Sequence, residues 1–246
     1  TDINFWNNFG PVLKEGIYED FERKESILEI ALFKQSASSE LITLNEYISN
    51  MQKKQKDIYF ITGDNYESVI NNPSLEGYKS RNINVLILDD PVDSFWTSST
   101  PSYKENNFKS VTQGVDDLDK LGKKTEEDTN EKSVNSLLVF LKEKLKEKVK
   151  DVRVSKRLTD SPVCLVGDEG AMDPHLEKIL QQHNQLNQGI SLKVMEINPS
   201  HSLIKKLDKM SKNKDKIGDL ENIAILLYEQ SKILDCLLYT SPSPRD

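Results

Sequence analysis

No apolar run in this sequence approaches the roughly 20 residues that a helix needs to cross a bilayer. The 246 residues include only two cysteines, Cys164 and Cys236, which excludes a disulfide scaffold or a paired-cysteine metal motif and suits a reducing cytoplasm. The three histidines, His175, His183 and His201, lack cysteine or carboxylate partners at metal-ligand spacing. We therefore expect surface histidines, no metal, no membrane segment and a cytoplasmic location.

Catalytic motifs are missing as well. The chain contains no GxxxxGKS or GxxxxGKT phosphate loop and no serine in a Gly-x-Ser-x-Gly turn. Two predicted strands imitate a dinucleotide-binding unit, but the turn after the first has a single glycine, Gly63, followed by Asp64, whose carboxylate would repel a phosphate. Cys164 lies in an apolar stretch and is expected to be an inert buried thiol. The sequence thus predicts no catalytic residue and no cofactor site.

The composition is typical of a globular protein with a highly charged surface, because 36% of the residues are hydrophobic and 30% are charged. The net charge of −7 argues against nucleic acid or an anionic membrane as a partner, since each would bind a basic face.

Apolar periodicity predicts helices over the first 34 residues and a polar loop at 35–40. A helix then leads into a strand at Asp57–Thr62, a helix at Asn65–Ile70 and a strand at Asn84–Leu88. The last strand is apolar without alternation, which favours a parallel βαβ unit covered on both faces.

The run GKKTEEDTNEK at 122–132 has almost no apolar side chain and is the predicted domain boundary. The second half has the pattern of an α+β domain. Its expected elements are a helix over 134–149, strands at Asp151–Ser155, Val163–Val166 and Leu192–Ile197, and helices at Met172–Gln182 and Ile217–Leu234.

Four blocks in this order resemble one family, the ninety-kilodalton heat-shock chaperones, and its bacterial HtpG-type branch above all. They are Phe5–Asp20, Ile42–Asp64, Val149–Val166 and Glu196–Leu207. Within the second block the resemblance is carried by Leu44, Tyr47, Met51, Gln55, Ile58, Tyr59, Ile61, Thr62 and Gly63.

The resemblance implies a fragment of an ATP-dependent chaperone that assists folding and forms homodimers. It implies linking helices at 1–34, a small αβα middle subdomain at 35–121 and a truncated C-terminal dimerisation domain at 133–235. The family's nucleotide pocket and phosphate-contacting arginine would precede Thr1, so ATP and magnesium are expected of the parent and not of this fragment. Leu32 departs from the family pattern, which usually has an arginine there in a linking helix.

The resemblance also implies contacts with unfolded or non-native client proteins. The candidate residues are two aromatics beside a Ser/Thr/Pro loop and an aliphatic helical stripe: Phe95, Trp96, Met172, Leu176, Ile179 and Leu180. The alternative that all six are ordinary core residues stays open, because helical stripes usually face a core.

For dimerisation, the resemblance implies the last long helix, with its stripe of Leu220, Ile223, Leu227 and Leu234. The tail at 236–246 does not resemble the family's next helix, because Pro242 and Pro244 would break a helix. We expect an artefact or a disordered end there, and impaired dimerisation. Two other interpretations remain: a small α/β enzyme with an unrecognised site, and a purely structural dimerisation module.

Overall fold

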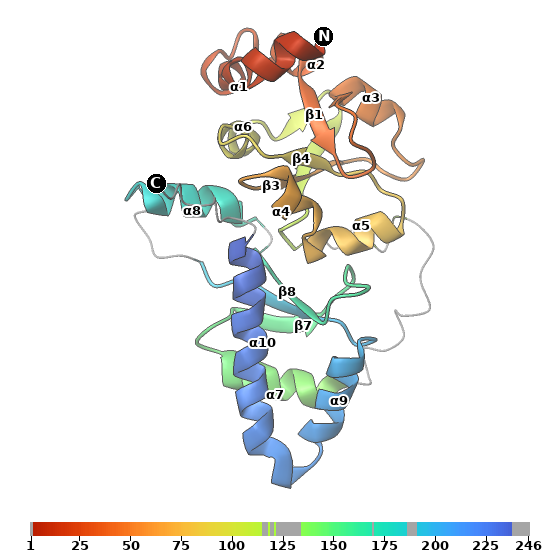
Figure 1. Cartoon of the computed structure of the whole chain (residues 1–246), viewed down its shortest axis with the longest axis vertical. Coiled ribbons are helices and arrows are strands. Elements are labelled where there is room, and N and C mark those ends of the chain that lie inside the picture. Colours follow the sequence, from red (N-terminus) through yellow and green to blue (C-terminus); the bar gives the residue numbers. More distant parts are fainter. Residues whose placement is uncertain are drawn as a thin grey trace.

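The computed structural model describes residues 2–114, 118, 121, 134–168, 170–185 and 191–237. Within these residues the chain has a mixed αβ fold with two sheets, one in each half, as the sequence predicts. The two halves follow one another along the long axis of the molecule (Figure 1). The predicted linker at 122–132 and the tail from residue 238 onward lie outside the described residues.

The chain opens with helix α1 (Ile3–Glu19), whose N-terminus is capped by the Asp2 carboxylate, and continues with α2 (Lys24–Ile30). The prediction of helix up to residue 34 is wrong, because Ala31 turns extended and Leu32–Gln35 form strand β1. β1 pairs with two other strands, and this tertiary pairing overrides the helical periodicity. Leu32 therefore lies in a strand, and the predicted boundary after residue 34 falls within β1.

The described part of the first sheet has strand order β2-β1-β4-β3-β6-β5. Its centre is the parallel set β4-β3-β6, and the pairings towards both edges are antiparallel. The expected parallel βαβ unit is confirmed at the centre, whereas the edge strands are too short for a periodic signal. The remaining elements are β2 (Ile42–Thr43), α3 (Leu44–Ser49), β3 (Ile58–Thr62), α4 (Tyr66–Ile70), α5 (Glu76–Ser80), β4 (Leu86–Leu88), α6 (Asp93–Ser99), β5 (Ser102–Tyr103) and β6 (Asn106–Ser110).

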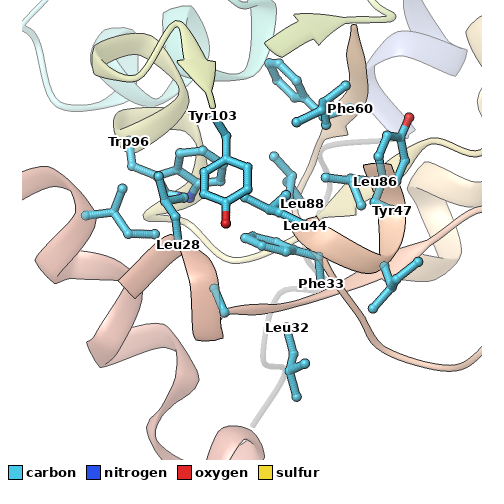
Figure 2. Packing of buried hydrophobic residues seen from close by; sticks show 14 of the residues in the cluster. Leu28, Leu32, Phe33, Leu44, Tyr47, Phe60, Leu86, Leu88, Trp96 and Tyr103 are labelled. Carbon is cyan, nitrogen blue, oxygen red and sulfur yellow. The ribbon is translucent and has the colours of Figure 1, made fainter. Parts of the chain in front are cut away.

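Strand β3 is buried along its whole length, and its side chains alternate between two apolar clusters. Phe60 faces the cluster drawn in Figure 2, which Trp96 and Phe33 join with their rings 5.9 Å apart. On the other face the Tyr59 ring lies 5.0 Å from that of Tyr78. A strand covered on both faces explains the continuous apolar run in the sequence.

In its described residues the second half contains a three-stranded sheet of order β7-β9-β8, in which β7 runs parallel and β8 antiparallel to β9. Helices α7, α9 and α10 pack together with this sheet around a separate core that includes Leu141, Met195 and Leu227 (Figure 1). The bounds are α7 (Asn135–Leu145), β7 (Asp151–Val154), β8 (Val163–Val166), α8 (Pro174–Gln182), β9 (Val194–Ile197), α9 (Ser202–Ser211) and α10 (Ile217–Leu237).

Buried polar groups join the two halves. The guanidinium of Arg157 donates to the Glu196 carboxylate in its own half and to the carbonyls of Val111 and Gln113 in the other. Burial acts to raise the pKa of the Glu196 carboxyl, but the charges of Arg157 and Arg153 and the hydrogen bonds from Arg153 and Ser155 together outweigh it, and the net shift is downward. This pair therefore stays ionised inside the joint.

A second contact across the joint is made by the carboxylate of Glu76 at the start of α5. It accepts hydrogen bonds from the backbone N–H groups of Thr159, Asp160 and Ser161, at 2.7, 2.8 and 3.1 Å. Three convergent N–H groups hold a carboxylate strongly because each bond is charge-assisted. Next to it, a Cβ built on Gly77 would lie 2.6 Å from the Arg157 Cα atom, so only glycine permits this approach.

We predict that Gly77→Ala lowers the free energy of unfolding by roughly 1–3 kcal/mol, the usual cost of overpacking. The matched control is Gly218→Ala in α10, where a Cβ meets nothing within 4 Å. That substitution should be neutral or stabilise by up to about 1 kcal/mol through helix propensity. Urea denaturation of both variants provides the comparison. Equal effects at the two glycines would show that the close approach at Gly77 is not a constraint.

Candidate functional site

Helix α6 carries the two predicted aromatic contacts, and the structure separates them. Trp96 is 0% exposed and donates its indole N–H to Asp93 Oδ1 at 2.6 Å. Phe95 is half-buried, with its ring 6.2 Å from that of Tyr18. The expectation of an exposed pair is therefore corrected for Trp96, whose polar indole N–H is satisfied inside the core.

The orientation of α6 is set by a buried ion cluster. Lys14 of α1 lies 2.6 Å from the Asp90 carboxylate and 3.0 Å from that of Asp93. Burial acts to lower the pKa of the Lys14 ammonium, but the two carboxylates outweigh it and the net shift is upward. Burial raises the pKa of Asp93, an effect that Lys14 only partly offsets. Because Asp93 also holds the Trp96 indole, this cluster fixes which aromatic side chain points inward.

Helix α8 carries the predicted aliphatic stripe. Its N-cap is Asp173, whose carboxylate accepts from the backbone N–H of His175 at 3.0 Å, and Pro174 occupies the first turn. Just before the helix Met172 is 45% exposed, whereas Leu176 is only 5% exposed. Ile179 and Leu180 are half-buried. Exposure therefore varies along the stripe, and Leu176, which is buried, departs from the expected exposure.

The structure brings the two predicted client segments together, because α8 packs against α6. Between them lies His175, which is buried, although the sequence suggested a surface histidine. Its Nδ1 atom is 2.7 Å from Ser94 Oγ and its Nε2 atom 2.9 Å from Asp64 Oδ1. The Asp-Pro helix start signals that residue 175 lies in the first turn, but which partners it meets depends on tertiary packing.

Helix α10 has two apolar faces, and the predicted dimerisation stripe lies mainly on the inner one. Leu220 and Leu227 are buried in the core of the second half, and Ile223 packs partly against it. Of the four predicted residues only Leu234 belongs to the exposed apolar set. That set also includes residues that the periodicity did not single out: Ile217, Ile225, Leu226 and Ile233.

The two faces of α10 explain this correction. Periodicity identifies an apolar stripe but not whether that stripe contacts the helix's own domain or a partner. Here the domain core takes the face that includes Leu220 and Leu227. A face with Leu226 at 57% exposure remains in contact with solvent.

Other reactive groups in the described residues form no site. Cys164 is buried, as predicted, and burial raises the pKa of its thiol well above the usual range, so it is a poor nucleophile. In the described part of the chain, no group of three or more histidine, cysteine, aspartate or glutamate side chains could hold a metal ion. No helix in that part is long and apolar enough to cross a membrane.

Comparison with known proteins places this architecture in a family. The family model described as "Hsp90 protein" matches residues 3–238. The chain is 42% identical over 242 residues to the chaperone protein HtpG of Rhodospirillum rubrum, covering 95% of this chain and 38% of that protein. It is 44% identical over 239 residues to HtpG of Paramagnetospirillum magneticum, covering 94% of this chain and 38% of that protein.

The chain therefore belongs to the Hsp90 protein family, and it spans about two fifths of the length of the curated relatives that it matches. A solved structure, the middle domain of a putative heat shock protein from Plasmodium falciparum, is 38% identical. It covers 44% of this chain and 46% of that chain, with a TM-score of 0.42.

Proposed function

We propose that this chain is the client-binding and self-association part of an ATP-dependent chaperone that assists protein folding. The observation that supports this proposal most strongly is the position of Phe95, Met172, Leu176, Ile179 and Leu180. In the described part of the chain, none of these five apolar side chains belongs to the hydrophobic clusters of either half or is packed against one. Met172 is 45% exposed and Phe95, Ile179 and Leu180 are half-buried, and apolar side chains that stay accessible to solvent are typical of an interaction surface.

The chemistry of this surface suits non-native polypeptides. Met172 is unbranched and polarisable, so it adapts to apolar groups of different shape. It precedes the helix that carries the half-buried Ile179 and Leu180, and the ring of Phe95 is on the neighbouring helix. A client would bind by covering these side chains, with a contribution that grows with the apolar area removed from water.

We predict that the triple variant Met172→Ala, Ile179→Ala, Leu180→Ala weakens binding of an unfolded model polypeptide about tenfold, which corresponds to about 1.4 kcal/mol. Fluorescence anisotropy with a labelled, reduced and carboxymethylated polypeptide measures the affinity. The matched control replaces three exposed apolar residues elsewhere, Val12, Phe21 and Val139, by alanine.

The control triple should leave the affinity unchanged. Trp96→Ala provides a second comparison, this time of stability. Truncation of a core aromatic lowers the free energy of unfolding by about 3–5 kcal/mol. Equal loss of affinity in both triple variants would mean that binding is non-specific adhesion to any exposed apolar group, and the proposed client surface would be wrong.

For the nucleotide, we propose that ATP is bound by regions of the parent protein outside this span, and that this chain by itself has no ATPase activity. The sequence has no phosphate loop, and the turn after β3 presents the Asp64 carboxylate. Calorimetric titration with ATP and magnesium should give only the heat of dilution. Saturable binding at micromolar ATP would contradict the proposal that ATP is bound only outside this span.

For self-association, we propose that copies of the chain meet through the outer face of α10. The exposed set on one helix is small compared with obligate dimer interfaces, which bury on the order of 2,000 Å² or more. We therefore predict a mainly monomeric chain at low micromolar concentration in sedimentation velocity, with weak association at higher concentration. Leu226→Asp with Ile233→Asp should abolish that association without loss of stability.

Leu227→Ala on the inner face of α10 should instead cost about 2–5 kcal/mol of stability. A discrete, tight dimer that survives the double aspartate change would place the interface elsewhere. The burial of Trp96 and Leu176 also supports a second candidate function, a purely structural self-association module. That alternative predicts weak self-association together with no measurable affinity for unfolded polypeptides.

A further inference from the structure

Helix α8 is encoded in the second half of the chain, but it is held by the first half. Among the helices and strands it packs most closely against α6. In the described residues, the core of the second half includes side chains from α7, α9 and α10 and none from α8. In Figure 1, α8 lies beside the first half of the chain, well away from α7 and α9.

The first attachment is the carboxylate of Asp173. Besides capping α8, it accepts hydrogen bonds from Thr62 Oγ1 at 2.8 Å and from Ser110 Oγ at 3.0 Å. These hydroxyls stand at the carboxyl ends of the parallel strands β3 and β6. The Asp173 side chain thus fixes the start of α8 to the carboxyl ends of two central strands of the first sheet.

The second attachment is His175, in the first turn of α8. Its two ring nitrogens lie within hydrogen-bond distance of Ser94 at the start of α6 and of Asp64 after β3. Lys178, on the same helix, has its ammonium 3.8 Å from the other Asp64 oxygen. The contacts are polar, and polar groups that part across such an interface regain hydrogen bonds from water.

These contacts differ from those that hold the other helices. α7, α9 and α10 each place several aliphatic side chains in a core, whereas the buried apolar side chains of α8 are Leu176 and the ring of Pro174. Separation of α8 therefore exposes little apolar surface while its polar attachments become hydrated. An element held in this way is expected at the low-stability end of the structure.

We propose that α8 is a releasable lid, closed in this structure, that controls access to its own client-binding stripe. In the closed arrangement α8 packs against α6, Leu176 is buried, and Ile179 and Leu180 are half-buried. Release from Thr62, Ser110, Ser94 and Asp64 exposes the whole stripe. This inference rests on the proposed client-binding function, and it assigns Asp173 and His175 as positioning residues of that site.

The test removes attachment points on the first half and leaves α8 itself unchanged. The variant is Thr62→Val with Ser94→Ala, which leaves the buried Asp173 and His175 each without one partner when α8 is docked and thus favours release. The matched control makes the same two changes on α6, Thr97→Val with Ser98→Ala, where the hydroxyls bond only carbonyls of their own helix.

Two measurements are made on the full chain: hydrogen exchange of the amides at 174–182, and affinity for the labelled unfolded polypeptide. We expect at least about tenfold faster exchange in α8 of the lid variant, with β3 and β9 as protected as in the parent. If the open state is populated at about 10% or less, full opening tightens polypeptide binding roughly tenfold or more. The control should match the parent in both measurements.

Unchanged exchange in α8 would overturn the lid, whatever the affinity. Faster exchange with unchanged affinity would also overturn it, because α8 would then open without controlling binding. A parent chain that binds no polypeptide at all would refute the proposed function instead, and the exchange data would still report the docking of α8. Should the double variant fail to fold, Ser94→Ala against Ser98→Ala gives the same comparison.

Discussion

The arrangement of the two halves depends on one buried guanidinium. Arg157 is 2% exposed, and a buried cation is tolerated only when it is paired and hydrogen-bonded. Glu196 supplies the counter-charge from β9, while the carbonyls of Val111 and Gln113 supply acceptors from the chain after β6. Neither half alone satisfies the guanidinium, so the two sheets are locked in one relative position. The absence of a side chain at Gly77 is a consequence, because Arg157 must come this close.

A second buried charge determines which of the two aromatic residues on α6 is buried. Lys14 reaches from α1 to Asp93, and Asp93 in turn accepts the indole N–H of Trp96. The indole is therefore directed into the core, and Phe95, one residue earlier, is directed towards the edge, where it meets Tyr18. Of two adjacent aromatics, the one with a polar group that the core can satisfy is buried, and the purely apolar one stays partly accessible.

The sequence predicts the central strands and the long helices because their periodic signals extend over many residues. It does not predict β1, since Leu32 continues the apolar spacing of the preceding helix and only pairing with β2 and β4 makes the segment extended. The candidate site is predicted as two segments, but not their contact, because Ser94 and His175 are far apart in the chain and meet through folding. The inner and outer faces of α10 are likewise indistinguishable in a sequence where both are apolar.

The polar contacts that hold α8, together with its apolar stripe, suggest why this part of the fold suits a chaperone. A joint made only of apolar contacts would aggregate or collapse when opened, because it would leave a large apolar patch in water. Asp173 and His175 avoid this, since their hydrogen bonds exchange with water when α8 leaves. Only the small stripe around Leu176 then stays without a partner, and that stripe is the surface that a non-native polypeptide would cover. Under the proposed release of α8, the contacts of Arg157 would keep the two sheets in place, so that motion would be confined to α8.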